Sequence, residues 1–554
     1  MHKIVIIILL KMMILAGCTT QAQYYQVLTN GMINAKKDTV LSEIISYHNV
    51  RIDNNGNILP WYSANLGESY DDVLNRVWSF WKNMELDSNG IKYYMNHQVW
   101  RPGHDKRGLG GDQIMMALSS WDMFYNYIGD ESVIKNMKYM ADYYLAHSLS
   151  SPDSKWPDLP YPYNTIVESG LYDGDMILGK GYLQPDKAGS FGFELLKLYK
   201  KTGDKKYLST AVKIANTLAS KVRPGDNDNS PWPFKVNAET GETGILVDQA
   251  KWHERMSEGL EKSNPKNKKS AYTTNWTSTL DLFTGLIALQ EGNADAYKKA
   301  FDITINWLKT YPAKTNKWGP FFEDVPGWSD TQINGITYAM YIIEHPDLDP
   351  NWKETVNNIF QWVHKELGDK EFIKYGVICT DEQTQYRVPG NSHSSRQASV
   401  ELMYWEKTGD TTYTRNAILQ LNWATYMVDF DGKNLYPRDD IWMTDGYGDY
   451  VRHYLRAMAA APQLAPENAD HLLRTSSTIC KISYQPAGIF YNTFDKTSEE
   501  IFRLISKPKM VRINGRIIKE VNGIKSNGWI WQSLDKGGIL KIKQEKGSKI
   551  EIIK

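Results

Sequence analysis

Residues able to carry acid, base or sugar-binding chemistry gather in three clusters of this 554-residue chain. The first cluster, residues 100–112, holds His104, Arg107 and Asp112 in a glycine-rich stretch. Its glycines invite comparison with a dinucleotide-binding loop, but Gln113 stands where the last glycine should be and no strand precedes it. We therefore reject that interpretation. Two roles stay open for Asp112: it could cap the N-terminus of the following helix, or it could be a carboxylate that faces a cleft.

The second cluster, residues 376–396, combines Glu382, Arg387, His393 and Arg396. A neighbouring serine would be enough to cap the helix that begins here, so a His and an Arg in its first turn need another explanation. Arg offers a planar fork for a carboxylate, and His exchanges protons near neutral pH. The density of these residues favours a ligand site. A Gly-x-Ser-x-Gly elbow is missing from the sequence, which argues against a serine esterase.

The third cluster, residues 436–453, contains Asp445 and Tyr447 just before a predicted helix. Asp449 and His453 follow, four residues apart and so on one helix face, where they could form a structural salt bridge alone. Asp445 is therefore the better candidate for a catalytic carboxylate.

Aromatic residues and further carboxylates occupy other long loops, with Trp156, Asp186 and Trp328 as candidate substrate-binding residues. The chain has 19 Trp and 34 Tyr, many of them outside apolar helix faces. Flat rings with a polar edge suit sugar rings, although some of these aromatics are expected to be ordinary packing anchors. Residues 226–230 begin like a calcium loop, but Pro231 occupies the position that needs Gly. We predict no metal.

Hydrophobic periodicity indicates which elements position these clusters. We predict twelve helices, at residues 69–84, 111–128, 131–148, 187–201, 204–221, 276–290, 294–310, 330–345, 350–366, 393–408, 411–428 and 447–461. Their connections alternate between short and long.

Three short connections share a Gly-Asp break: 129–130, 203–204 and 409–410. The glycine can end one helix at positive φ and the aspartate can cap the next, so each unit is a helical hairpin. The copy at 199–207 reads Tyr-x-x-Thr-Gly-Asp-x-x-Tyr, and a variant with one extra residue spans 404–413.

Six such hairpins resemble the (α/α)6 toroid shared by many glycoside hydrolases and several polysaccharide lyases. The resemblance covers about residues 65–465 and selects no family within the class. It implies that the even-numbered helices form the inner ring and that the long loops before them line the active cleft. We therefore predict that the long loops and the first turns of the six even-numbered helices lie on one rim of the ring.

The rest of the chain has a different pattern. Residues 466–554 are predicted to form a small β-sheet or sandwich module with a packing role. Its short β-branched or alternating segments are 479–484, 488–494, 500–504, 509–513, 529–532, 539–544 and 549–553. Residues 50–61 are predicted to form a hairpin-like strand pair. The expected organisation is a signal peptide over 1–17, an N-terminal extension with short strands over 18–65, a mainly α toroid over 66–465 and the β-sheet domain over 466–554.

The N-terminus is typical of a bacterial lipoprotein signal. A short apolar run precedes Leu15-Ala16-Gly17-Cys18, which favours cleavage before Cys18 and lipid attachment to its thiol. The alternative is an ordinary secretory signal. We expect a lipid-anchored protein on the outer membrane or cell surface, with the periplasmic face as the alternative.

Composition excludes other classes. The 64 basic and 64 acidic residues balance, which removes the electrostatic basis for nucleic-acid binding. Cys379 and Cys480 fall in different predicted domains, which argues against a disulfide framework. We expect a monomer without cofactors whose partner is a polysaccharide or oligosaccharide.

Two enzyme chemistries fit one cleft. Glycoside hydrolysis needs paired carboxylates, for which Asp445, Glu382 and Asp112 are the first candidates. Polysaccharide lyase chemistry needs a cation beside a uronate and a base such as Tyr447 or His393. We favour the hydrolase, with His104, Arg107, Arg387 and Arg396 recognising an acidic sugar. The lyase is second, and a non-catalytic surface glycan-binding lipoprotein is third.

Overall fold

The computed structural model describes residues 38–86, 90–92, 94, 111–162, 181–244, 270–321, 328–434, 449–523 and 526–554, with the side chains of 111–113 left undescribed. Every structural statement below concerns these residues.

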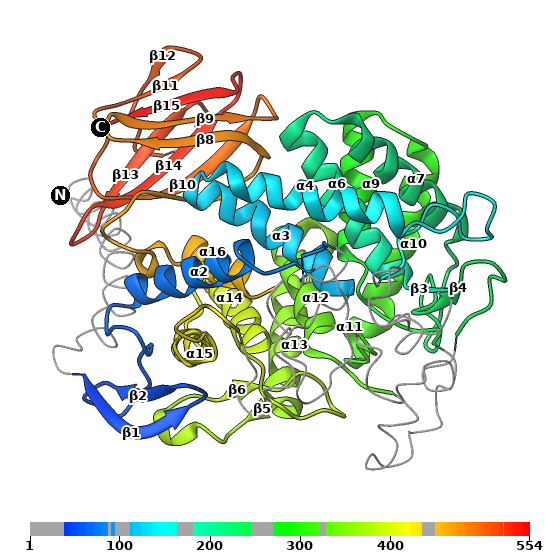
Figure 1. Ribbon diagram of the computed structural model, residues 1–554, viewed down its shortest axis with the longest axis horizontal. Helices are drawn as coiled ribbons and strands as arrows, with labels where there is room; N and C mark the ends of the chain where they lie inside the picture. Colours follow the sequence, from blue (N-terminus) through cyan, green and yellow to red (C-terminus); the bar gives the residue numbers. More distant parts are fainter. Residues whose placement is uncertain are drawn as a thin grey trace, which may run out of the picture.

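The described part of the chain contains the twelve predicted helices close to their predicted positions (Figure 1). They are α2 (Leu66–Lys82), α3 (Gly111–Ile128), α4 (Glu131–His147), α6 (Pro185–Thr202), α7 (Lys205–Lys221), α9 (Thr277–Leu289), α10 (Ala294–Thr310), α12 (Gln332–Glu344), α13 (Trp352–Glu366), α14 (Asn391–Thr408), α15 (Thr414–Ala424) and α16 (Tyr450–Ala460).

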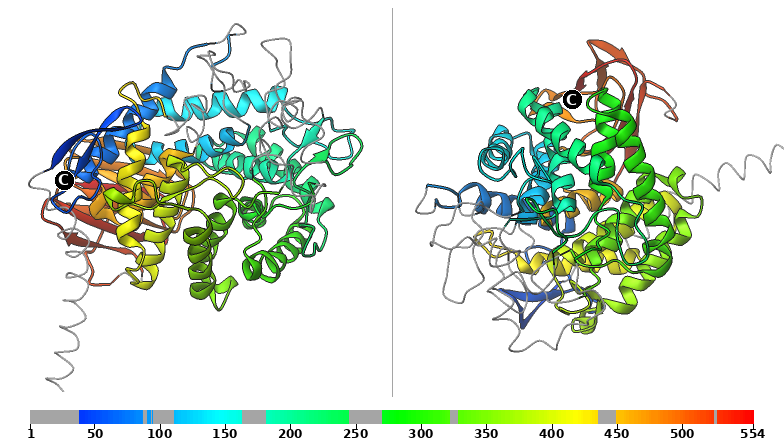
Figure 2. Two further views of the ribbon diagram at one scale, coloured as in Figure 1. Left: turned by 90° about the horizontal axis from the view of Figure 1, so that it is seen from below. Right: turned by 90° about the vertical axis from the view of Figure 1, so that its right-hand side faces the viewer.

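Six of these helices form a closed inner ring. Neighbours pack in the order α3, α6, α9, α12, α14 and α16, and α16 packs back against α3. The other helix of each hairpin lies outside this inner ring. The helix α2 packs against α16 and completes the outer layer. Two perpendicular views show this arrangement of helical pairs (Figure 2). The predicted (α/α)6 toroid with a C-terminal β module is confirmed.

The Gly-Asp connections have the predicted geometry. Gly203 ends α6 with φ 75° and donates its backbone N–H to the carbonyl of Tyr199, while the Asp204 side chain accepts from the N–H of Lys206 at 3.2 Å. Gly129 and Gly409 have φ 72° and 77°. Glycine adopts this left-handed conformation without a Cβ penalty, so each hairpin turns tightly.

Some helices begin or end at other residues than predicted. α2 begins three residues earlier than predicted because the Asn65 side chain caps it by accepting from the N–H of Glu68. α15 is shorter than predicted, and a 3₁₀ turn, η5 (Thr425–Met427), follows it. The short helix α11 (Pro312–Thr315) and the 3₁₀ turns η3 (Pro346–Leu348), η4 (Ile373–Tyr375) and η7 (Pro462–Leu464) lie in connections.

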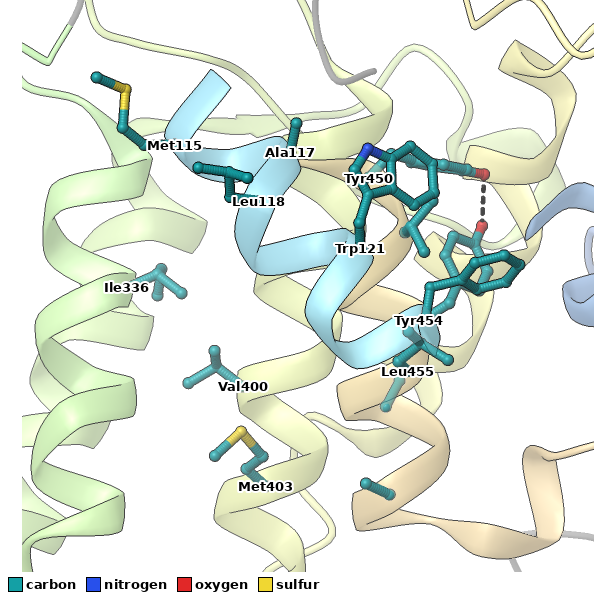
Figure 3. Packing of buried hydrophobic residues seen from close by; sticks show 14 of the residues in the cluster. Met115, Ala117, Leu118, Trp121, Ile336, Val400, Met403, Tyr450, Tyr454 and Leu455 are labelled. Atoms are coloured by element: carbon teal, nitrogen blue, oxygen red, sulfur yellow. Dashed lines mark hydrogen bonds between the residues drawn. The ribbon is translucent and has the colours of Figure 1, made fainter. Parts of the chain in front are cut away.

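The core lies between the two helix layers and between neighbouring inner helices. Figure 3 shows the buried side chains of Trp121 from α3, Val400 from α14 and Leu455 from α16. The Tyr450 hydroxyl donates to the Tyr454 hydroxyl at 2.9 Å. Trp121 is fully buried. Burying such large side chains is the main force that holds the hairpins together.

The N-terminal strand pair differs from the prediction. β1 (Thr39–Ile45) pairs antiparallel with β2 (His48–Ile52), so the partner of residues 48–52 precedes them in the chain. Within the predicted pair, residues 50–61, only an isolated bridge joins Ile52 and Ile58 among the described residues. The turn between them is held by Asp53, whose carboxylate accepts from the N–H groups of Asn55 and Asn57. Those bonds satisfy the turn locally without a second strand.

The C-terminal module is a pair of antiparallel sheets. One has the order β13-β14-β10-β7 and the other β12-β11-β15-β9-β8. The strands are β7 (His471–Thr475), β8 (Ile479–Gln485), β9 (Gly488–Thr493), β10 (Ser498–Leu504), β11 (Met510–Ile513), β12 (Arg516–Ile518), β13 (Gly528–Ser533), β14 (Gly538–Gln544) and β15 (Lys549–Ile553). The sequence patterns missed β7 and β12. Two-residue strands pair as β3 (Tyr182–Leu183) with β4 (Val236–Asn237) and β5 (Gly368–Asp369) with β6 (Cys379–Thr380).

The module packs on the ring at the C-terminal ends of α3 and α6. The Tyr484 hydroxyl donates to the carbonyl of Asn126, and the Lys201 ammonium donates to the carbonyl of Ile479 at 2.8 Å. The His471 ring stacks on Tyr127 with centroids 3.7 Å apart. The module therefore closes the ring end opposite the starts of the inner helices.

Among the described helices, none combines the length and the apolar character needed to cross a membrane. Cys379 and Cys480 are both free thiols.

Candidate functional site

The starts of the inner helices form one rim, joined by side-chain contacts. Asn275, just before α9, donates to Asp186 in the first turn of α6. Arg396 of α14 donates to Gln332 at the start of α12, and Ser392 of α14 donates to Asp449 at the start of α16. Consecutive helices of the ring therefore meet through polar groups at this end.

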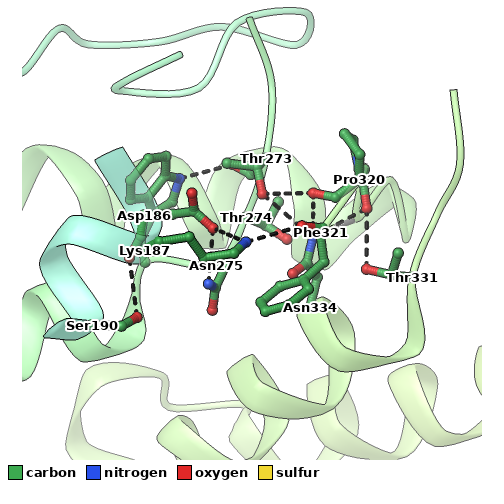
Figure 4. Close-up of polar contacts among 12 residues, drawn as sticks. Asp186, Lys187, Ser190, Thr273, Thr274, Asn275, Pro320, Phe321, Thr331 and Asn334 are labelled. Carbon is green, nitrogen blue, oxygen red and sulfur yellow. Dashed lines mark hydrogen bonds and ion pairs between the residues drawn. The ribbon is translucent and has the colours of Figure 1, made fainter. Parts of the chain in front are cut away.

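Asp186 is a carboxylate of this rim that neighbouring side chains hold firmly (Figure 4). It follows Pro185, whose ring suits the first position of a helix, and an acid in the first turn interacts favourably with the helix dipole. Asp186 is fully buried, and its Oδ2 accepts from Lys187 Nζ at 2.8 Å and from Asn275 Nδ2 at 2.9 Å. Its Oδ1 has no hydrogen-bond partner among the described residues.

Lys187 gives Asp186 its counter-charge. Its ammonium also donates to the carbonyl of Phe321 at 2.9 Å and lies 3.5 Å from the centroid of that ring. A buried charge pair of this kind is stable only when its hydrogen bonds are satisfied. One carboxylate oxygen is thus used for anchoring, and the other has no hydrogen-bond partner among the described residues.

Asp449 is the centre of a second charged cluster. Arg396 and Arg452 both form ion pairs with it, and Ser392 Oγ donates to it at 2.7 Å. His453 Nε2 lies 3.0 Å from its Oδ2. Asp449 is therefore a structural acceptor, held by Arg396, Arg452 and Ser392. Two guanidinium groups share one carboxylate, so these three side chains together carry one net positive charge.

Both histidines of this cluster are neutral. Burial, followed by the nearby Arg396 and His453, lowers the pKa of His393 well below its usual value. Burial and three arginines, Arg396 first, lower the pKa of His453 in the same way. A neutral imidazole can accept a proton, which a charged one cannot.

Gly390 allows His393 to adopt its position. It has φ −101° and ψ 146°, an extended conformation open to any residue, but a Cβ there would overlap His393 Nδ1. The glycine is required by the close approach of the imidazole and not by the backbone.

The other described candidates occupy distinct environments. Glu382 is 5% exposed, and its Oε1 accepts from Gln383 Nε2 at 2.8 Å. Its backbone carbonyl accepts from the N–H of Gln332, so it lies at the same rim. The Arg387 side chain is 53% exposed and lies 4.0 Å from Asp381 Oδ2 at the rim periphery.

The two tryptophans serve in packing. Trp156 is 3% exposed and belongs to the hydrophobic core. Trp328 is half-buried, lies against Tyr272 with ring centroids 5.3 Å apart, and donates its Nε1–H to Asp330 at 2.8 Å.

Several predicted site residues lie outside the described part of the chain. They are Cys18, His104, Arg107, Asp445 and Tyr447. Asp112 lies in the first turn of α3, but its side chain is outside the description.

A cavity of about 540 Å³ runs inside the ring beneath this rim. Lys187, Asn275, Phe321 and Arg396 line its rim end, while Asp281, Glu344 and Arg456 line its deeper part. Burial raises the pKa of Asp281 to about 8, and the neighbouring Glu344 charge adds to the rise. The partners of Asp186 therefore face a space large enough for a small ligand.

Sequence reasoning missed Lys187, Asn275 and Gln332. Asn275 and Gln332 stand next to the starts of inner helices, where the toroid resemblance places the active cleft, and Lys187 directly follows a candidate carboxylate. A search for any amide or cation at each inner-helix start would have found all three.

The described residues provide no group of three or more His, Cys, Asp or Glu side chains that could hold a metal ion. In the calcium-like loop, Asp226 Oδ1 instead accepts from the N–H groups of Asp228 and Asn229. The loop's own amides therefore occupy this carboxylate oxygen.

Solved structures share the ring. A sugar epimerase from a ruminal bacterium matches with TM-score 0.50 and 11% identity over 71% of this chain and 98% of that one. A cellobiose 2-epimerase from Spirochaeta thermophila DSM 6192 has TM-score 0.49 and 12% identity over 72% and 97%. A family 76 glycoside hydrolase (mannosidase) from Bacteroides thetaiotaomicron has TM-score 0.41 and 12% identity over 72% and 98%. At such identities the likeness shows the fold alone. No protein-family model and no curated protein matches the chain.

Proposed function

We propose that this chain is a carbohydrate-processing enzyme of the six-hairpin type, and specifically a glycoside hydrolase that acts on a uronate-containing polysaccharide or oligosaccharide. The observation that carries the proposal is the state of Asp186. It is a buried carboxylate with one oxygen anchored by a cation and an amide and the other without a partner among the described residues. The sugar epimerase that shares this ring supports a saccharide as the ligand.

Hydrolysis of a glycosidic bond needs one carboxylate to activate water or attack the sugar and one carboxylic acid to protonate the leaving oxygen. Asp186 suits the first role because Lys187 balances its negative charge. Glu382, on the same rim, is the described candidate for the second role. Asp445 and Asp112 are the alternatives for that role.

The charges at the rim support an acidic sugar as the substrate. Arg396 and Arg452 line the cavity and share Asp449, so the rim carries a positive excess that one sugar carboxylate would neutralise. Tyr447, His104 and Arg107 are proposed to add contacts from the rim loops, and Arg387 from the periphery.

A second function is favoured by one observation. His393 and Arg396 lie three residues apart near the start of α14, and an imidazole with a guanidinium is the pair needed to remove a proton from a sugar carbon beside a carboxylate. Such a step leads to β-elimination in a lyase or to epimerisation if the proton returns.

The test incubates the purified protein with matched neutral and uronate oligosaccharides. New reducing ends without an ultraviolet-absorbing unsaturated product support the hydrolase. An unsaturated product supports the lyase, and solvent deuterium in an uncleaved sugar supports epimerisation. Binding without turnover on the whole panel would support a surface glycan-binding lipoprotein anchored through Cys18.

A further inference from the structure

A buried line of polar side chains leads away from Arg396 toward the outer helix layer. Arg396 Nη1 donates to Gln332 Oε1 at 2.9 Å, and Gln332 Nε2 donates to Gln397 Oε1 at 3.3 Å. Gln397 Nε2 donates in turn to Glu401 Oε1 at 2.7 Å, one turn further along α14. Both glutamines are fully buried, so none of these bonds competes with water.

The line ends at an ion pair. His364 of α13 lies 2.6 Å from Glu401 Oε1, and the Glu401 side chain is 0% exposed while that of His364 is 25% exposed. The His364 ring stacks on Tyr413, the other titratable group facing it, with centroids 5.4 Å apart and planes 5° apart. Burial lowers the pKa of His364, but the Glu401 charge and hydrogen bond outweigh it, so the net shift is upward.

The direction of the line follows from its last member. An ionised carboxylate only accepts hydrogen bonds, so Glu401 requires the NH₂ end of the Gln397 amide. That orientation turns the Gln397 oxygen toward Gln332, which must then offer its own NH₂. The Gln332 oxygen is left pointing at Arg396, whose guanidinium only donates. One buried carboxylate thus fixes two amides that could otherwise take either orientation.

We propose that Glu401, held by His364, is a positioning residue that orients Arg396 toward the cavity through Gln397 and Gln332. Only the ligand of Arg396, a sugar carboxylate, rests on the proposed function. The orientation of Arg396 by Glu401 does not depend on that function.

The experiment compares crystal structures and sodium D-glucuronate binding for four proteins: wild type, Glu401→Gln, Gln397→Met and the control Glu366→Gln. Glu366 is a half-buried α13 carboxylate that pairs with Lys365 and is close to His364 in sequence, so its amide variant makes the same chemical change outside the line. Glutamine at 401 both donates and accepts, so the amides are free to turn. In Glu401→Gln and Gln397→Met, the two line variants, we expect Arg396 to lose its hydrogen bond to Gln332 and glucuronate binding to weaken about tenfold. The control should behave as wild type.

A rescue variant distinguishes positioning from a general structural effect. Gln332→Glu in the Glu401→Gln background gives Arg396 an acceptor that needs no orienting partner, so binding and the Arg396 contact should return. If Glu401 acts only through packing, a change at 332 restores nothing. Arg396 still bonded to Gln332 in both line variants, with unchanged glucuronate affinity, would overturn the proposal. If wild-type protein binds no glucuronate, the uronate proposal fails, and the crystal structures alone decide whether Glu401 orients Arg396.

Discussion

Replacing Asp186 by Asn tests the catalytic role that we propose for this carboxylate against its structural role. The substitution preserves shape but removes the charge that balances Lys187, 2.8 Å away in a fully buried pair. Leaving one member of such a pair uncompensated costs about 3 kcal/mol. Loss of the carboxylate from general acid–base or nucleophilic chemistry should lower kcat by about 10² or more.

A double-mutant cycle resolves these two effects. In Asp186→Asn/Lys187→Met the uncompensated ammonium is gone, so the free energy of unfolding should recover most of the loss, while turnover should stay low. Stability is measured by urea unfolding and turnover by reducing-end release on the saccharide that wild type cleaves. The matched control is Asp302→Asn, an exposed carboxylate paired with Lys298, which should change neither quantity. Wild-type turnover in the stable double variant would refute a catalytic role for Asp186.

Three further predictions concern other parts of the chain. Gly390→Ala should displace His393 and lower turnover by up to about 10² while leaving the fold intact, whereas Gly523→Ala, with open space around it, should be silent in the same assay. Burial raises the pKa of Glu500 from 4.5 to about 7. Its contribution of about 3 kcal/mol to the free energy of unfolding is therefore present below pH 4.5 and lost as pH rises to 7. Urea unfolding midpoints across this range should show that loss of stability, and Glu500→Gln should abolish it. Cys18→Ala should move the protein from the membrane fraction to the soluble periplasm if its thiol is lipidated, and unchanged fractionation would contradict lipidation.

The helices were predictable because their signals are local. The Gly203-Asp204 break specifies a positive-φ residue and a cap within two positions, and alternating loop lengths then specify which helices share a rim. β7 was missed because its burial comes from packing against α3 and α16, which its own sequence does not reveal. The partner of β2 was assigned to the wrong side because the Asp53 turn looks the same whether or not a strand follows it.

The candidate site was predictable by region but not by partner. The sequence marks the first turns of the inner helices, and Asp186, His393 and Arg396 lie there. It cannot show that Asn275 reaches Asp186 across 89 positions, or that Asp449 is shared by Arg396 from 53 positions away. Such contacts are set by ring closure, which brings together helices that are distant in sequence.

The most direct test of the account is product analysis of wild-type protein on a uronate oligosaccharide and on the same oligosaccharide with its carboxyl groups reduced to alcohols. A uronate-specific hydrolase should release reducing ends without unsaturated product from the acidic form. It should turn over the reduced form much more slowly, because Arg396 and Arg452 then meet no ligand charge. Equal hydrolysis of both forms would contradict the uronate assignment. An unsaturated product from the acidic form would contradict the hydrolase and favour proton abstraction by His393.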